Sequence, residues 1–311
     1  MLLEDLQLVL KVARFRSITA AAADLDLRTS TASAALKRVE TALGTELFIR
    51  STRQLRLSAA GERFIPKCEQ ALLTLEQARQ NLKEDSDSVE GELRIALSSD
   101  LGRNLVIPWL DDFMQTYPRV SLRAHVSDSN IDFYRDSVDI ALRYGSPTDS
   151  SLYGFKICNV PGALCATRDY LDENGTPRFP QELAAHNGLF YQLHDIIHDT
   201  RTFTREGKEH RIKMSGNRAS NDGDLVRRWC VAGKGLAVKS CLDMSADLLA
   251  GRVVSVMPEY KPRRTELWLV CPSRQMITPV VRLLRDSFRQ KSKAILDQLV
   301  RKRILEPSTL E

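Results

Sequence analysis

Residues 18–56 read ITAAAADLDLRTSTASAALKRVETALGTELFIRSTRQLR, and this segment sets the architecture of the N-terminal part of the chain. The alanines that follow Thr19 leave little side-chain bulk, so a second helix can pack closely against the first. From Thr29 onward, apolar residues recur at helical spacing on one face only. The pattern predicts two helices joined by a turn, with a polar face on the second helix.

That second helix has two chemically different faces. Its apolar face comprises Ala32, Leu36, Val39 and Leu43. Its outer face comprises Thr29, Ser30, Ser33 and Lys37. Small hydroxylic and cationic side chains enter a major groove without steric conflict and donate hydrogen bonds to base edges and phosphates. The outer face is therefore a candidate DNA-reading surface.

Residues 46–57 predict two short strands around a turn, with Arg50, Arg53 and Arg56 spaced through them. Such a wing would lie along a DNA backbone or reach a minor groove. Any three-helix bundle with a hairpin shows similar periodicity. The order of the elements, together with the placement of the arginines, favours a winged helix-turn-helix that binds double-stranded DNA.

The composition sets limits on the rest of the chain. A length of 311 residues predicts two or three compact units. No apolar run is long enough to span a membrane, and the start MLLED lacks the basic region of a signal peptide, so we expect a cytoplasmic protein without membrane contact. The net charge of +5 is weak evidence for nucleic-acid binding, because residues 282–303 alone hold eight basic against two acidic side chains.

No catalytic or metal chemistry stands out. The six cysteines form no C-x-x-C pair and read as reduced thiols, although a redox-sensing role stays open because it depends on an exposed thiolate of low pKa. His194 and His198 have the spacing of metal ligands on a helix but lack an evident third ligand. G-x-S-x-G and P-loop motifs are absent. We therefore expect that the protein is not an enzyme and that it binds neither a metal nor a cofactor.

A long helix should follow the wing and reach about Lys83, with Pro66 tolerated near its beginning. Its apolar residues alternate spacings of four and three, as in a coiled coil: Phe64, Cys68, Ala71, Leu75, Ala78 and Leu82. The stripe predicts pairing with a second chain, with packing on the next domain as the alternative. We assign residues 1–58 to the DNA-binding domain and 59–90 to the linker helix and hinge.

Beyond the hinge, strand-like and helical segments alternate. The predicted strands are 93–97, 121–126, 138–143, 162–166, 235–239 and 266–270, and the predicted helices are 104–117, 222–232, 245–250 and 279–289. Alternation favours a doubly wound α/β domain of mainly parallel strands over residues 91–290, with a ligand in the crevice between two halves. Residues 291–311 form a basic tail that packs on its own domain or a neighbour, or contacts DNA phosphates.

The loop Ser98–Gly102 separates the first strand of this domain from its helix. Its hydroxyl and backbone N–H groups suit a carboxylate or another hydrogen-bonding ligand. Ordinary helix capping explains the same residues. Asp100 would repel an anion unless its side chain points away, so the charge of the ligand stays open.

The N-terminal segment closely resembles the LysR-type transcriptional regulators. The matching residues include Thr19–Ala22, Leu36–Glu40, Leu43–Gly44, Leu47–Phe48, Thr52–Arg53 and Ala60–Glu62, and weaker matches continue through Val138–Gly145 and Ala232–Ala237. The resemblance implies an α/β protein with an N-terminal winged helix-turn-helix, a long dimerising linker helix and a two-subdomain effector domain like a periplasmic binding protein. It also implies a homodimer that assembles to a homotetramer.

Carried over by position, the resemblance places DNA contacts at Thr29, Ser30, Ser33, Ala34, Lys37 and Arg53, and the wing adds Arg50. Three positions depart from the family pattern. Thr29 replaces a common glutamine and Ala34 a common arginine, so operator preference should differ. Arg28 replaces a usual serine, which loses a helix cap and adds a phosphate contact.

The resemblance further implies effector contacts at Ser98, Ser99, Asp100, Ser127, Asp128, Arg143, Thr200, Thr202 and Asn221. Arg143 has an alternative role, which is to brace the fold against Asp139 or Asp149. The expected partners are DNA, a small-molecule effector, further copies of the chain and, as an additional candidate, RNA polymerase. An architectural DNA binder with a vestigial pocket is the competing function.

Overall fold

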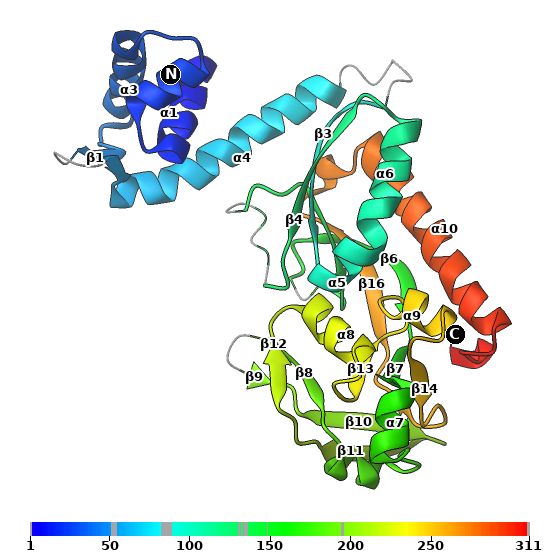
Figure 1. Ribbon diagram of the computed structural model, residues 1–311. Helices are drawn as coiled ribbons and strands as arrows, with labels where there is room; N and C mark the ends of the chain where they lie inside the picture. Colours follow the sequence, from blue (N-terminus) through cyan, green and yellow to red (C-terminus); the bar gives the residue numbers. More distant parts are fainter. Residues whose placement is uncertain are drawn as a thin grey trace. The chain divides into compact units, whose positions relative to one another are not determined.

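The computed structural model describes residues 2–50, 55–81, 89–129, 131, 133, 136–147, 149–193 and 196–309. The chain divides into two compact units, the first formed mainly by residues 1–88 and the second by most of residues 89–311. Figure 1 shows both units and labels many of their helices and strands. Each unit is described separately below.

The first unit begins with three helices and a hairpin, which we call the head. Its elements are α1 (Leu3–Phe15), α2 (Ile18–Asp24), α3 (Thr29–Leu43), β1 (Phe48–Arg50) and β2 (Leu55–Leu57). Ser17 caps α2 by accepting the Ala20 N–H at 3.2 Å. Ala21 and Ala22 are buried against α3, as their small size predicted. The expected winged helix-turn-helix is therefore confirmed.

Two contacts fix the hairpin to the helices. The Glu40 carboxylate on α3 accepts the N–H groups of Leu47 and Phe48 at 2.8 and 3.3 Å. Gly61 follows the hairpin, and a Cβ there would lie 2.2 Å from the Leu47 carbonyl oxygen. Such an approach excludes any side chain, so glycine is required at this position.

Helix α4 (Ala59–Asn81) leads out of the head. The helix continues through Pro66, as the sequence predicted. Phe64 and Ile65 pack against the core of the head, and Cys68 is buried. Farther along the predicted stripe Leu75 is 55% exposed, so the apolar face of α4 is not covered within the first unit at this point.

The second unit contains two subdomains. The first is built on a sheet with the order β4-β3-β5-β16-β6. Its strands are β3 (Gly91–Leu97), β4 (Val120–Val126), β5 (Ile140–Tyr144), β6 (Tyr153–Val160) and β16 (Thr265–Cys271). A continuous helical segment follows β3, formed by α5 (Ser99–Leu101), a π-helix (Gly102–Val106) and α6 (Ile107–Thr116). Helix α10 (Pro279–Arg301) packs against β6 and α6 (Figure 1).

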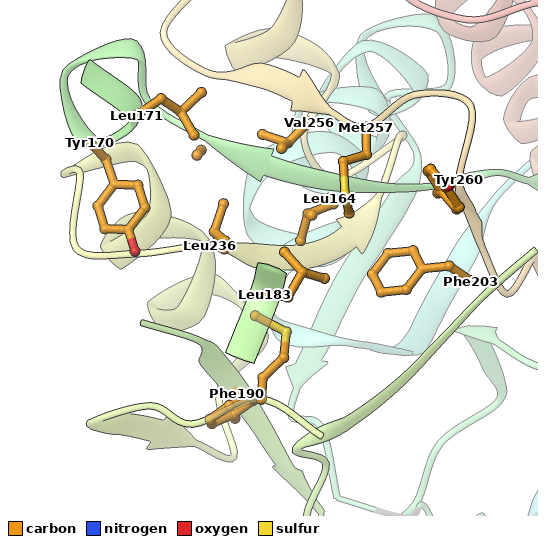
Figure 2. Packing of buried hydrophobic residues seen from close by; sticks show 12 residues of the cluster. Leu164, Tyr170, Leu171, Leu183, Phe190, Phe203, Leu236, Val256, Met257 and Tyr260 are labelled. Atoms are coloured by element: carbon orange, nitrogen blue, oxygen red, sulfur yellow. The ribbon is translucent and has the colours of Figure 1, made fainter. Parts of the chain in front are cut away.

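The second subdomain lies between β6 and β16 in the sequence. Its strands are β7 (Gly162–Ala166), β8 (Leu189–Leu193), β9 (Ile196–Ile197), β10 (Thr200–Arg205), β11 (Lys208–Lys213), β12 (Arg218–Ser220), β13 (Ala237–Ser240), β14 (Val254–Val256) and β15 (Lys261–Pro262). Its helices include α7 (Arg168–Asn174), α8 (Gly223–Val231) and α9 (Ser245–Leu249). Figure 2 shows its core, in which Leu164, Leu183, Phe203 and Leu236 are buried.

The strand pairing differs from the sequence-based expectation. Strand β3 pairs in parallel with β4 and β5, but β16 is antiparallel to β5 and β6, and most described pairings of the second subdomain are antiparallel. The prediction of mainly parallel strands is therefore wrong for the described pairings. The reason is that the chain leaves the first subdomain after β6 and returns along β16, which reverses the strand direction.

The C-terminal helix is longer than predicted. Helix α10 continues to Arg301, through residues that the sequence assigned to a basic tail. Ser292, Leu296 and Leu299 on this extension are buried, so the apolar positions of the tail pack on the chain's own second unit. The end of the effector domain at residue 290 remains a prediction.

Candidate functional site

Helix α3 presents the predicted polar face to solvent. Arg28, Thr29, Ser30, Ala34 and Lys37 are exposed, and Ser33 is half-buried. On the opposite face Ala32, Ala35, Leu36 and Val39 are buried in the core of the head. The apolar face thus fixes the helix while the outer face stays free to meet a partner.

The cations on this face differ in their contacts. Arg38 pairs with the buried Asp5 carboxylate at 2.5 Å and therefore holds α3 to α1. Arg28 and Lys37 have no ion-pair partner among the described residues. Arg28 precedes α3 without forming a side-chain cap, as its replacement of a serine predicted. These two cations are the ones available to phosphates.

The wing is only partly described. The backbone of Arg50 belongs to β1, and its side chain lies outside the described residues. Arg53 lies outside the described residues altogether. Arg56 on β2 is exposed. The roles assigned to Arg50 and Arg53 remain predictions from the sequence.

The second unit contains a pocket between its subdomains, with a volume of about 400 Å³, which is within the usual size of small-molecule sites. Its lining comprises Ser99, Arg103, Val126, Ser127, Asp128 and Ser129 from the first subdomain and Tyr191, Gln192, Leu193, Asn221 and Asp222 from the second. Ser99, Ser127, Asp128 and Asn221 were singled out from the sequence, and the structure brings these four together in one pocket.

Polar contacts connect the two walls of this pocket. The Arg103 guanidinium pairs with Asp222 at 2.8 Å. Burial opposes ionisation of Asp222, but the hydrogen bonds from Arg103 and the Leu225 N–H outweigh it, so the pKa of this carboxyl lies below its ordinary value. Below this pair, the Asn104 side-chain amide donates to Asp224 at 2.8 Å. A change in the angle between the subdomains would have to break or stretch these contacts.

Asp100 points away from the pocket into a buried cluster. It is 3% exposed and pairs with Lys239, whose ammonium also lies 3.8 Å from the Asp243 carboxylate. Burial and the repulsion from Asp243 raise the pKa of Asp100 to about 7, although Lys239 opposes this rise. Asp100 does not line the pocket and would not face a bound anion, so the effector contact predicted at this residue is not supported by the lining of the pocket.

Arg143 holds the pocket loop. Its guanidinium donates to the Ser129 and Ser127 carbonyl oxygens at 2.7 and 2.9 Å. The alternative partners expected from the sequence are both otherwise engaged. Asp139 pairs with Arg94, and Asp149 accepts hydrogen bonds from Ser151. Arg143 therefore positions the backbone of the loop that carries Asp128.

Three further predicted residues do not line the pocket. Ser98 precedes the pocket residue Ser99 and is half-buried. Thr200 and Thr202 lie on β10, which pairs with β11 and β15, and the Thr200 hydroxyl donates to the Asp199 carboxylate at 3.1 Å. The wall from the second subdomain is formed instead by β8 and by Asn221 and Asp222, which follow β12.

Several lining residues were missed by the sequence analysis. Tyr191, Gln192 and Leu193 belong to β8, a strand that the sequence analysis did not predict. Arg103 lies one helical turn after Ser99, and that spacing could have suggested it. Asp222 caps α8 beside Asn221 and accepts the Asp224 and Leu225 N–H groups.

A second cavity of about 330 Å³ lies elsewhere in the second unit. It is lined in part by Tyr260, Arg303 and Glu306. None of the residues selected from the sequence reaches it. We therefore regard the pocket between the subdomains as the candidate site.

The thiols do not have the character of redox sensors. All six cysteines are described, and Cys158 alone is more than marginally accessible. Burial raises the pKa of every thiol, to about 11 at Cys158 and about 12 at Cys230. A sensing cysteine requires the opposite shift, so the geometry disfavours the redox role left open by the sequence.

Metal-binding clusters and membrane-spanning helices are absent from the described residues. The described residues contain no cluster of three or more metal-ligating side chains. His194, one of the predicted pair, lies outside the described residues. No helix in the described part of the chain has the length and hydrophobicity that crossing a membrane requires.

Two family models match the chain. Residues 3–62 match the "Bacterial regulatory helix-turn-helix protein, lysR family". Residues 86–293, which include the pocket, match the "LysR substrate binding domain". Together the two matches account for the head and for the second unit.

Individual proteins give the same result. The chain is 30% identical to the transcriptional regulator DmlR of Escherichia coli K12 across 93% of this chain and 94% of that protein. It is 28% identical to the activator TtdR of the same organism across 86% of each chain. The full-length structure of the Vibrio cholerae virulence activator AphB, 24% identical, has the same fold with a TM-score of 0.59, covering 93% of this chain and 98% of that one.

Proposed function

Because the chain belongs to the LysR family of transcriptional regulators, and not to a family of enzymes, we propose that it reads an operator with the outer face of α3. The observation that carries this proposal is the division of α3 into a buried apolar face and an exposed face of hydroxyls and of cations that have no ion-pair partner among the described residues. Thr29, Ser30, Ser33 and Ala34 would contact bases. Arg28 and Lys37, with Arg50 and Arg53 of the wing, would contact phosphates.

A footprint on DNA upstream of its own or a neighbouring gene tests this proposal. Lys37→Ala should weaken binding about equally on all sequences and reduce the slope of affinity against salt by about one counterion. Ser33→Ala should instead change the preference among operator variants. Lys208→Ala, which removes an exposed charge from the second unit, is the control and should leave the salt slope unchanged. Absence of any protection at low salt contradicts the proposal.

The second part of the proposal concerns ligand sensing. A small molecule would bind in the pocket beside Ser99, Ser127, Asp128 and Asn221, with Arg143 holding the loop behind them. It would favour one angle between the subdomains and, through α4, one spacing of the heads. The ligand shifts this equilibrium only as far as it binds one arrangement better than the other.

A pocket-filling variant separates sensing from DNA binding. Leu193→Trp adds bulk to the lining of the pocket and lies far in sequence from α3. A metabolite panel screened by thermal shift should contain a compound that stabilises the wild type, and this variant should lose that response while keeping the footprint. If no metabolite stabilises the wild type, the architectural DNA binder becomes the better description.

The third part concerns assembly. Leu75 is exposed on α4, in register with the buried Cys68, and a second copy of the chain would cover this stripe. Such a dimer presents two recognition helices to successive major grooves, and dimers would pair into a tetramer. Leu75→Lys should lower the mass measured by light scattering, whereas Lys67→Ala on the same helix should not. Contact with RNA polymerase and a cytoplasmic location follow from this role as further proposals.

A further inference from the structure

The Asp128 carboxylate accepts three hydrogen bonds from its own chain. One oxygen accepts the Ser99 N–H at 2.7 Å. The other accepts the Ser99 hydroxyl at 2.5 Å and the Gly223 N–H at 2.7 Å. Three convergent donors, two of them backbone N–H groups, form the environment that a bound carboxylate normally requires. In this protein the carboxylate belongs to the pocket wall.

The donors come from both sides of the pocket, and further hydrogen bonds hold them in place. Ser99 belongs to the first subdomain and Gly223 to the second, so Asp128 bridges them. The Ser99 hydroxyl also accepts the Asp224 N–H at 3.3 Å. The Gly223 carbonyl accepts from the buried Lys239 ammonium at 2.9 Å. Gly223 is thus held through both its N–H and its carbonyl group, and a ligand cannot recruit that N–H without displacing Asp128.

The charges that line the pocket also disfavour an anionic group at this end. Its carboxylates are Asp128 and Asp222, and its cation is Arg103, which pairs with Asp222 at 2.8 Å. An incoming carboxylate would meet the negative charge of Asp128 at close range and would have to compete for Arg103. A protonated amine or a hydroxyl would instead find acceptors at this end of the pocket.

On the basis of the ligand-sensing function proposed above, we propose that Asp128 is the specificity-determining residue of the pocket. Its carboxylate, which belongs to the protein itself, occupies the position that an anionic effector would take. The effector therefore presents a cationic or neutral hydrogen-bond donor to this end of the pocket. A carboxylate group, if the effector has one, is directed elsewhere.

The test compares two probes of similar size and opposite charge, propionate and n-propylammonium, on the full chain. Binding is measured by calorimetry, and stability by tryptophan fluorescence, since Trp109, Trp229 and Trp268 all lie in the second unit. The wild type should prefer n-propylammonium. Asp128→Ala frees the three donors and removes the charge, so the ratio of the two affinities should move at least tenfold toward propionate. Asp172→Ala, which removes an exposed charge from α7, should leave the ratio unchanged.

Asp128→Asn is a second variant for the case that Asp128→Ala does not fold. Its amide keeps the shape of the side chain and one acceptor oxygen but carries no charge. It should lose the preference for n-propylammonium while retaining the wild-type tryptophan transition. A wild type that prefers propionate, or a folded Asp128 variant whose ratio does not move, overturns the proposal. The footprint is measured on each variant in parallel. If the footprint persists and the ratio does not move, only this inference fails; if the wild type gives no footprint, the proposed function itself fails.

Discussion

The outer face of α3 and the pocket of the second unit are both polar surfaces, but they are built in opposite ways. The residues of α3 occupy consecutive turns of one helix, and their exposure follows from its period. The pocket residues come from the start of a helix, the end of β4, strand β8 and the start of α8. A surface made by one element can be read from local sequence, whereas a surface made by four elements depends on how they are packed.

The largest effect should come from the buried face of α3. Leu36→Ala removes a side chain that is 1% exposed and should destabilise the head by about 3 kcal/mol, through lost burial and the cavity left behind. Calorimetry should show the transition of the head at a lower temperature. The unfolding transition followed by tryptophan fluorescence reports on the second unit alone, and its midpoint should not change. Thr29→Ala on the exposed face is the matched control and should change stability by less than about 0.5 kcal/mol.

The next largest effect should come from Arg143, which holds a loop of the pocket. Arg143→Ala removes two charged hydrogen bonds to loop carbonyls and should destabilise the second unit by about 2 kcal/mol. Arg123→Ala on β4, in the same sheet, removes an exposed ion pair with Glu92 and should cost less than about 0.5 kcal/mol. Equal losses in the two variants, measured by denaturant titration of tryptophan fluorescence, would contradict the positioning role.

The pH dependence of the second unit should report on the cluster behind the pocket. The pKa of Asp100 rises from 3.8 to about 7 on folding, so the folded state holds the proton more tightly than the unfolded state. Its contribution to stability is complete below about pH 4 and is lost as the pH rises through 7. Asp100→Asn should flatten the change of the tryptophan transition between these pH values. An unchanged profile would mean that Asp100 is ionised throughout.

The smallest effect should be the reactivity of the thiols. Because burial raises the pKa of all six, native protein at neutral pH should react with a maleimide far more slowly than free cysteine does. Cys158, the most accessible, should react first. Mass spectrometry of the labelled peptides identifies the site. Rapid labelling of Cys230 would restore the redox hypothesis.

Structure could be predicted from the sequence best where a pattern is local. The periodicity around Leu36 identified α3 and its two faces, and the alanines after Thr19 identified α2. In the second unit, strands that lead into helices were found, among them β3 and β7. Strands such as β8 and β10 were missed, because their pairing partners and not their own periodicity determine them.

By itself, the sequence determined which faces of the head are apolar and which residues α3 exposes to solvent. Only the tertiary structure decided that Asp100 turns inward to Lys239, that Arg143 binds the loop carbonyls and that Asp128 meets donors from both subdomains. The physical reason is that helical periodicity is encoded within a few residues. The partner of a buried charge, in contrast, can come from a distant segment of the chain, as Lys239 does for Asp100.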